Sequence, residues 1–229
     1  MVIVDKKSFF LGVAMLAGFL VVLGVMFAPI LDGKNALQYS DLLYNAISKG
    51  SAYYVPLAHE EVAEFGGESI SMTLVMDDGR QAEQTAQFFK AGGAEVVVAG
   101  SELKIDGDLS EIMENSLSDA DAMYHNDGEK VARKYGYDER QVLYGWWKTL
   151  NEMETTLTSL KRFHAARMVA LVRNKVVEPA YNYYGIEPQN LTDRLGIVAF
   201  SLLFYVIYTV WYGFAIMSLF EGFGLRFGH

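Results

Sequence analysis

The longest uncharged stretch of the chain, residues 195–220, limits what the sequence can fold into more than any other feature. It reads LGIVAFSLLFYVIYTVWYGFAIMSLF, preceded by Arg194 and followed by Glu221. A helix rises about 1.5 Å per residue, so about 20 residues cross the roughly 30 Å hydrocarbon core of a bilayer. The stretch is therefore long enough to span a membrane with some tilt.

A second uncharged run, residues 8–31, follows Lys6 and Lys7 near the start of the sequence. A cleaved signal peptide is one reading, but the apolar core of a signal peptide is about 7–15 residues long. The end of this run, Phe27–Leu31, also lacks an A-x-A cleavage pattern. We therefore expect an uncleaved anchor, and hence a two-pass membrane protein with a domain between its spans.

Composition excludes several classes of site. The chain has no cysteine, which rules out disulfides, thiolate zinc sites, cysteine-ligated iron–sulfur clusters and covalently attached c-type haem. The formal net charge of −9 disfavours nucleic acid as a partner, because phosphate binding needs a basic surface. Neither apolar run contains a histidine, so we expect no membrane b-type haem in this chain alone.

The first apolar run carries two pairs of small residues at helical spacing, Ala14 with Gly18 and Gly24 with Ala28. Small residues on one helical face let another transmembrane helix approach closely. The alternative is that Gly and Ala are simply common in membrane helices. We predict a partner-packing face at these four positions.

Three tyrosines of the second apolar run, Tyr205, Tyr208 and Tyr212, share one helical face. Tyr205 and Tyr208 lie near the middle of the run, where an unpaired hydroxyl is costly in lipid. We predict that this face contacts protein, either the first apolar run or another subunit. The alternative is aromatic bulk buried in lipid.

The chain between the spans begins with an acidic segment, residues 32–137. Alternating apolar residues and turn signals predict the order β-α-β-β-α, and hence a small mixed sheet with helices on one face. The expected elements are a strand at 69–76, a helix at 81–90, strands at 94–98 and 102–106, and a helix at 109–117. Residues 119–137 are polar and turn-rich.

From Asp138 onward the pattern predicts a long helical stalk, residues 138–193. Apolar residues recur at intervals that alternate between three and four residues, and this pattern is typical of a heptad seam. The seam residues are Leu143, Trp146, Leu150, Met153, Leu157 and Leu160. We predict one helix from Glu139 to Val177, interrupted at Pro179, with its seam buried against another helix of this chain or of a partner.

Charge is divided unevenly between these two segments. Residues 32–139 contain 21 acidic and eight basic side chains, whereas residues 140–192 contain four acidic and seven basic ones. The basic stalk could be solvated, meet anionic lipid or an acidic partner, or neutralise its own head. Lys6 and Lys7 favour cytoplasmic termini and an extracytoplasmic domain 32–193, although the basic stalk argues the other way.

Candidate catalytic and metal-ligating residues are few. His59 with Glu64, and Asp121 with His125, could each contribute to a divalent-cation site, but neither pair forms a complete ligand set. We predict no catalytic residue, no metal and no cofactor. A solvated acidic surface is the expected role of these side chains.

Taken together, these features predict an α+β membrane protein with two transmembrane helices flanking a small mixed α/β head and a long helical stalk. We expect a non-catalytic accessory or assembly subunit of a larger integral membrane complex in an inner or plasma membrane. A respiratory or electron-transfer complex is one candidate host. The expected partners are lipid and other integral membrane subunits or a second copy. The alternative is a membrane-anchored sensor or ligand-binding protein that acts through a partner.

The expected segments are a tail at 1–7, a span at 8–31, the head at 32–137, the stalk at 138–193, a span at 194–221 and a tail at 222–229.

Overall fold

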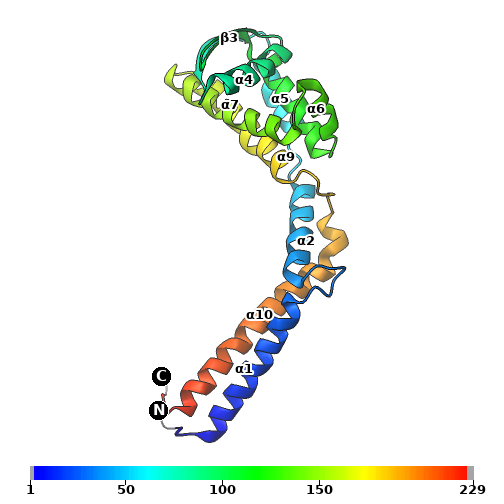
Figure 1. Ribbon diagram of the computed structural model, residues 1–229, viewed down its shortest axis with the longest axis vertical. Helices are drawn as coiled ribbons and strands as arrows, with labels where there is room; N and C mark the ends of the chain where they lie inside the picture. The colour runs from blue at the N-terminus through cyan, green and yellow to red at the C-terminus, as the bar shows by residue number, and fades with distance from the viewer. Residues whose placement is uncertain (1–2, 226–229) are drawn as a thin grey trace. The chain divides into compact units, whose positions relative to one another are not determined.

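The computed structural model describes residues 3–225, which form two compact units (Figure 1). The helix-pair unit contains the chain up to Ile47 and from Gln189 onward, and the head unit is Ser48–Pro188. Most of the described residues are helical, and their one sheet, of three strands, lies in the head unit. The expectation of a mixed α/β protein with two long apolar helices is confirmed.

The helix-pair unit is formed by α1 (Lys6–Phe27), most of α2 (Ala36–Ser51) and α10 (Leu191–Gly222). α1 and α10 run antiparallel and side by side (Figure 1), and each is long and apolar enough to cross a membrane. Asp5 caps α1, because its carboxylate accepts hydrogen bonds from the backbone N–H groups of Lys7 and Ser8. The cap satisfies donors that the first turn of a helix leaves unpaired.

α1 and α10 touch along a seam. The side chains of this seam are small near Gly12 and Gly222 and larger near Phe204. Toward the ends of the chain the seam is made of small residues. A Cβ added to Gly12 would lie 2.7 Å from the backbone nitrogen of Leu219, and one on Gly222 would lie 2.6 Å from the Cβ of Phe9. The seam positions of α10 alternate at spacings of four and three, which keeps one face directed at the partner helix. They are Phe204, Tyr208, Trp211, Ala215, Ser218 and Gly222.

α2 begins at a capping box. The side chain of Asn35 accepts a hydrogen bond from the backbone N–H of Gln38 at 2.8 Å, and Gln38 Oε1 accepts one from the backbone N–H of Asn35 at 3.0 Å. Farther along α2, the hydroxyl of Tyr44 lies 2.5 Å from Ser201 Oγ on α10. The capping box therefore defines where α2 begins, and the contact of Tyr44 with Ser201 attaches the middle of α2 to α10.

The head unit begins with the last residues of α2 and contains one small sheet among its helices. Its further elements are α3 (Val55–Ala63), β1 (Ser69–Val75), α4 (Gly79–Ala91), β2 (Glu95–Ala99), β3 (Glu102–Asp108), α5 (Leu109–Tyr124), α6 (Gly128–Tyr135), α7 (Glu139–Ser159), α8 (Phe163–Val172), the π-helix η1 (Arg173–Val177) and α9 (Glu178–Asn182).

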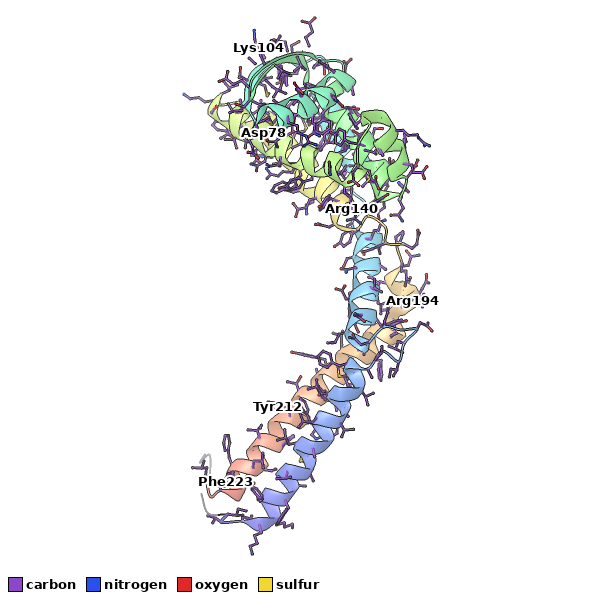
Figure 2. All side chains as sticks on the ribbon, in the orientation of Figure 1. Asp78, Lys104, Arg140, Arg194, Tyr212 and Phe223 are labelled. Carbon is purple, nitrogen blue, oxygen red and sulfur yellow. The ribbon has the colours of Figure 1, made fainter. Side chains whose placement is uncertain are left out.

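The sheet has the strand order β1-β3-β2, with β3 antiparallel to both neighbours. Successive side chains of a strand point to opposite faces. Ile70, Met72 and Leu74 of β1 are accordingly buried against the helices, and Ile105 of β3 is fully buried. The opposite face is exposed and includes Lys104 (Figure 2). Helices thus cover one face of the sheet, as the sequence predicted. Both strand pairs are antiparallel, however, so the expectation of a mixed sheet is wrong.

The segment expected to be irregular, residues 119–137, is largely helical. α5 continues to Tyr124 instead of ending near Leu117, and α6 follows after a short turn. α6 ends at Gly136, which has a φ of 80° in the left-handed region that glycine adopts without strain. The apolar residues that hold these helices are sparse along the sequence, which is why hydrophobic periodicity did not find them.

The single long helix predicted from Glu139 to Val177 is wrong. α7 ends at Ser159, and α8 begins at Phe163 and packs back against it. The stop is a Schellman motif, with hydrogen bonds from Arg162 N to Leu157 O at 2.9 Å and from Lys161 N to Thr158 O at 3.0 Å. Lys161 takes the left-handed conformation, with a φ of 60°. The predicted stalk is therefore a helical hairpin within the head unit.

The helical path also continues through Pro179 instead of stopping there. A proline in a helix lacks an N–H and clashes with the carbonyl four residues earlier. Here the π-helix η1 precedes it, and Glu178 N bonds to Arg173 O, five residues back. The wider turn relieves that clash, so α8, η1 and α9 follow one another without a loop.

Candidate functional site

The heptad seam of α7 lies inside the head unit. Leu143, Trp146, Leu150, Met153 and Leu157 are fully buried there among the helices and the sheet, whereas Leu160 is 52% exposed. The seam was predicted to be buried against a helix of this chain or of a partner, and five of its six residues are buried within this chain. Leu160 departs from the pattern because it is the C-cap residue, where the chain turns away from the helix axis.

Of the small residues predicted to form a packing face on α1, Gly18 lies against α10, but Ala14 and Gly24 do not. Ala14 and Gly24 are exposed, and a Cβ added to Gly24 would meet nothing within 4 Å. Ala28 is the half-buried C-cap residue, and Gly18 lies at the edge of the face, where an added Cβ would be 3.0 Å from the ring of Trp211. The close contact with α10 instead uses Gly12, which the sequence pattern did not single out.

The three predicted tyrosines of α10 divide into one that packs and two that are exposed. Tyr208 donates a hydrogen bond to the carbonyl oxygen of Phe19 at 3.1 Å, and their rings stack with centroids 4.2 Å apart. Tyr212 touches Phe19 but is 46% exposed, and Tyr205 is 68% exposed. The hydroxyl of Tyr208 therefore finds the protein partner expected of it, while Tyr205 and Tyr212 belong to the outer surface of the pair.

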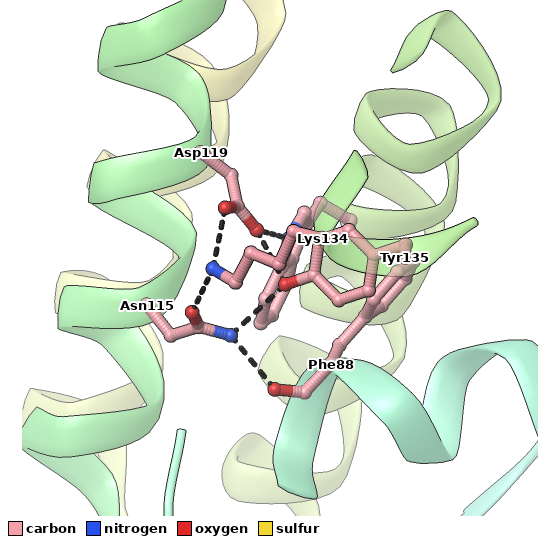
Figure 3. Close-up of polar contacts among 6 residues, drawn as sticks. Phe88, Asn115, Asp119, Lys134 and Tyr135 are labelled. Carbon is pink, nitrogen blue, oxygen red and sulfur yellow. Dashed lines mark hydrogen bonds and ion pairs between the residues drawn. The ribbon is translucent and has the colours of Figure 1, made fainter. Parts of the chain in front are cut away.

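A buried polar cluster joins α5, α6 and α7 (Figure 3). The carboxylate of Asp119 accepts hydrogen bonds from Tyr135 Oη at 2.5 Å, Trp146 Nε1 at 2.9 Å and Lys134 Nζ at 2.6 Å. Asn115 donates to the carbonyl oxygen of Phe88 at 2.8 Å. Burial, followed by the charge of Asp119, raises the pKa of Tyr135 well above its ordinary value. Because each polar group has a partner, the cluster fixes α7 against the rest of the head.

Lys49, near the end of α2, is a second buried charged side chain. Its Nζ donates to the carbonyl oxygen of Ile186 at 2.6 Å and to Asn126 Oδ1 at 3.0 Å, and it lies over the ring of Tyr124. Burial lowers the pKa of this lysine, while the charge of Glu187 opposes the shift. Lys49 thus ties residues 48–51 to two other segments of the head unit.

Three aromatic side chains of the head unit, one exposed and two half-buried, gather between α7 and α9. Tyr144, Trp147 and Tyr181 line a hollow of about 220 Å³, together with Glu178 and Asn182. Trp147 Nε1 donates to Glu178 Oε2 at 3.2 Å, and its ring lies parallel to that of Tyr144. Sequence reasoning missed this aromatic groove, because its two halves come from helices that the expected straight stalk would have held apart.

The histidines weighed as metal ligands pair with single carboxylates. His59 Nδ1 lies 2.7 Å from Glu114 Oε2, not from Glu64, and His125 Nδ1 lies 3.3 Å from Asp121 Oδ1. Tyr53 also donates to that Asp121 oxygen at 2.8 Å. Within residues 3–225, no three His, Cys, Asp or Glu side chains gather where they could hold a metal ion.

Comparisons of the chain with protein-family models, with curated proteins and with solved structures give no match. Its function is therefore inferred from its own residues.

Proposed function

We propose that this chain is a two-pass membrane protein and a non-catalytic accessory or assembly subunit of a larger integral membrane complex. α1 and α10 would be its spans, with both termini in the cytoplasm and the head unit outside. If the host is a respiratory or electron-transfer complex, other subunits would hold the redox groups, because this chain has no cysteine and neither apolar helix contains a histidine.

The observation that carries the proposal is the open small-residue face of α1. A helix in lipid gains no hydrophobic driving force from meeting another helix, so association depends on close packing over small residues. Gly12 makes such a contact with α10, but Ala14 and Gly24 lie on the opposite side and remain exposed. A second helix that packs on this face would gain the same close approach.

The test is to enlarge that face and follow the membrane proteins that co-purify in gentle detergent. Gly24→Ile and Ala14→Ile should release integral partners without disturbing the α1–α10 contact, because neither position faces α10. Val206→Phe is the control, since Val206 is exposed on α10 and lies away from the small-residue face of α1. Partners that persist in both variants as they do in the control would contradict the proposal.

The aromatic groove between α7 and α9 favours a second candidate function, a membrane-anchored ligand-binding or sensor protein. Small-molecule sites are concave and mainly apolar, with a few polar groups that set orientation, and the groove offers Glu178 and Asn182 beside its rings. In this case the chain purified without partners should gain thermal stability from a small molecule. Tyr144→Ala should abolish that gain while leaving the melting temperature without ligand nearly unchanged, because Tyr144 lines the groove and is 50% exposed.

A further inference from the structure

A large hollow lies in the helix-pair unit, between the end of α1, the first half of α2 and α10. Its volume is about 830 Å³, within the range of sites that hold small molecules. Most of its surface is apolar, with Ile30, Leu37, Phe200, Phe204 and Tyr205 among its lining residues. We call it the apolar groove. It lies at the end of the α1–α10 seam where the side chains are large, and Phe204 and Tyr208 belong to both the seam and the groove lining.

A smaller hollow of about 190 Å³ adjoins the apolar groove and has a different character. The two share Leu31, Asp32 and Tyr39, and the smaller one adds the basic side chains of Lys34 and Arg194. Among the described residues, no carboxylate forms an ion pair with Lys34 or Arg194. Arg194 Nε instead donates to Gln189 Oε1 at 2.8 Å. Asp32 is the one acidic side chain in this lining, so the basic end carries a net positive charge.

The two basic residues stand where the apolar runs meet charged sequence. Lys34 follows the first run and Arg194 directly precedes the second. In a two-pass protein these positions lie at the same surface of the bilayer, at the depth of the lipid phosphates. Basic pockets between transmembrane helices are known to bind anionic headgroups. Charge, depth and the adjoining apolar groove therefore point to one amphipathic ligand.

We propose that the apolar groove and its basic end form a binding site for one anionic phospholipid. An acyl chain lies along the apolar groove, and the phosphate lies near Lys34 and Arg194, with Tyr39 available as a hydrogen-bond donor. This inference rests on the membrane placement of α1 and α10 in the proposed function, but not on the presence of a host complex. A covering helix from another subunit would satisfy the apolar groove but would leave the two cations without an anion.

The first experiment measures lipid retention by native mass spectrometry of the full chain. Phosphatidylglycerol and phosphatidylcholine with identical acyl chains are supplied in equal amounts, and wild type should retain phosphatidylglycerol preferentially. Lys34→Gln and Arg194→Gln should each weaken that preference about fivefold, the effect of one basic residue near an anionic surface. Lys104→Gln, which removes an exposed charge from the head unit, is the charge-matched control and should change nothing. Ser40→Trp, which fills the apolar groove, should lower retention of both lipids.

Equal retention of the two lipids by wild type, or an unchanged preference in the Lys34→Gln, Arg194→Gln double variant, would overturn the proposal. A photoreactive benzoylphenylalanine in place of Leu37 crosslinks to whatever fills the apolar groove in intact membranes, and so distinguishes a lipid from a partner helix. Lipid adducts support the site, whereas adducts to protein alone assign the apolar groove to a partner helix. Inorganic phosphate should not displace the retained phosphatidylglycerol, and displacement would show that the basic end binds a free anion.

The same measurements distinguish this inference from the proposed function. Loss of co-purifying subunits in Gly24→Ile with lipid retention intact would support both. Lipid preference in a chain that never co-purifies with other membrane proteins would support the lipid site alone.

Discussion

Two neighbouring tyrosines of the head unit have opposite surroundings for their hydroxyl groups. Tyr135 Oη donates to the buried carboxylate of Asp119 at 2.5 Å. Tyr137 Oη is buried as well, but no hydrogen-bond partner lies within reach of it among the described residues. The same chemical change should therefore have different effects at the two positions.

We expect Tyr135→Phe to destabilise the head unit by about 1.5–3 kcal/mol, the usual contribution of a hydrogen bond to a charged group. Tyr137→Phe should leave stability unchanged or raise it by up to about 1 kcal/mol, because it removes a buried hydroxyl that lacks a partner. Thermal and urea unfolding of the two variants, followed by circular dichroism, measures both effects. Equal destabilisation would mean that Tyr137 has a partner in solution.

Alkaline pH should destabilise the head unit through tyrosines whose pKa is raised in the folded chain. Burial with the charge of Asp119 raises the pKa of Tyr137 to about 12. Burial, helped by hydrogen bonding to Asp121, raises the pKa of Tyr53 to about 12, but Tyr53 is 41% exposed, so solvent reduces its share of the effect. In the unfolded chain a tyrosine loses its proton near pH 10. Between these values the unfolded state binds fewer protons than the folded one, so stability is full below pH 10 and falls as pH rises toward 12.

Urea unfolding at a series of pH values should show this loss, together with a rise in tyrosinate absorbance on unfolding. The double variant Tyr53→Phe, Tyr137→Phe should have a shallower pH dependence. An identical slope in wild type and double variant would assign the alkaline transition to other groups.

At the scale of the element, two leucines of the α7 heptad can be compared directly by mutation. Leu157 and Leu160 occupy successive positions of the heptad, yet the first is fully buried and the second is 52% exposed. Leu157→Ala should cost about 2–5 kcal/mol, as truncation of a packed core leucine does. Leu160→Ala should cost less than about 0.5 kcal/mol, the usual limit for a surface substitution. Similar melting temperatures for the two variants would show that the hairpin does not form in solution.

The sequence predicted most elements of the head but not the path of the chain through its second half. The β-α-β-β-α order, the one-sided sheet and the buried seam of α7 follow from hydrophobic periodicity, which is strong in these segments. The turn after α7 escaped notice because its left-handed residue is Lys161, where a helix stop is normally marked by glycine. The aromatic groove between α7 and α9 depends on that turn, so it was missed for the same reason.

The face of α1 that meets α10 could not be identified from the sequence, for a related physical reason. Spacing of small residues indicates where a close approach is sterically allowed, but it does not say which partner makes it. Gly12 stands opposite Ala215 and the backbone of Leu219 on α10, so the two backbones meet there. Ala14 and Gly24 share the same chemistry, yet they lie on the other side of the helix.

At the scale of the whole chain, the uneven charge distribution is partly resolved within the head unit. Lys148 pairs with Asp77, and Arg162 pairs with Glu68. The basic second half of the head thus neutralises part of its acidic first half, which was one of the alternatives drawn from the sequence. Lys148 and Arg162 are therefore paired within the chain, which leaves fewer basic side chains to attract anionic lipid.

Orientation can be tested with a single cysteine, because the chain has none of its own. Lys104 is a suitable position, since its side chain is exposed on the open face of the sheet (Figure 2). Asp78 is less suitable, because its carboxylate caps α4 by accepting a hydrogen bond from Gln81 N. Lys104→Cys should react with an impermeant maleimide in intact cells. Labelling that appears only after lysis would place the head unit in the cytoplasm.

The pairing of α1 with α10 also has a consequence for the order of synthesis. The two helices come from opposite ends of the sequence, so α1 leaves the ribosome long before its partner exists. If α1 and α10 are the membrane spans we propose, α1 must remain in the bilayer as an isolated helix, with lipid tails beside Gly12, until residues 191–222 have been made. Assembly of such a pair is a second stage that follows insertion. Two fragments expressed separately, one ending before α10 and one beginning at Gln189, should then find each other in the membrane.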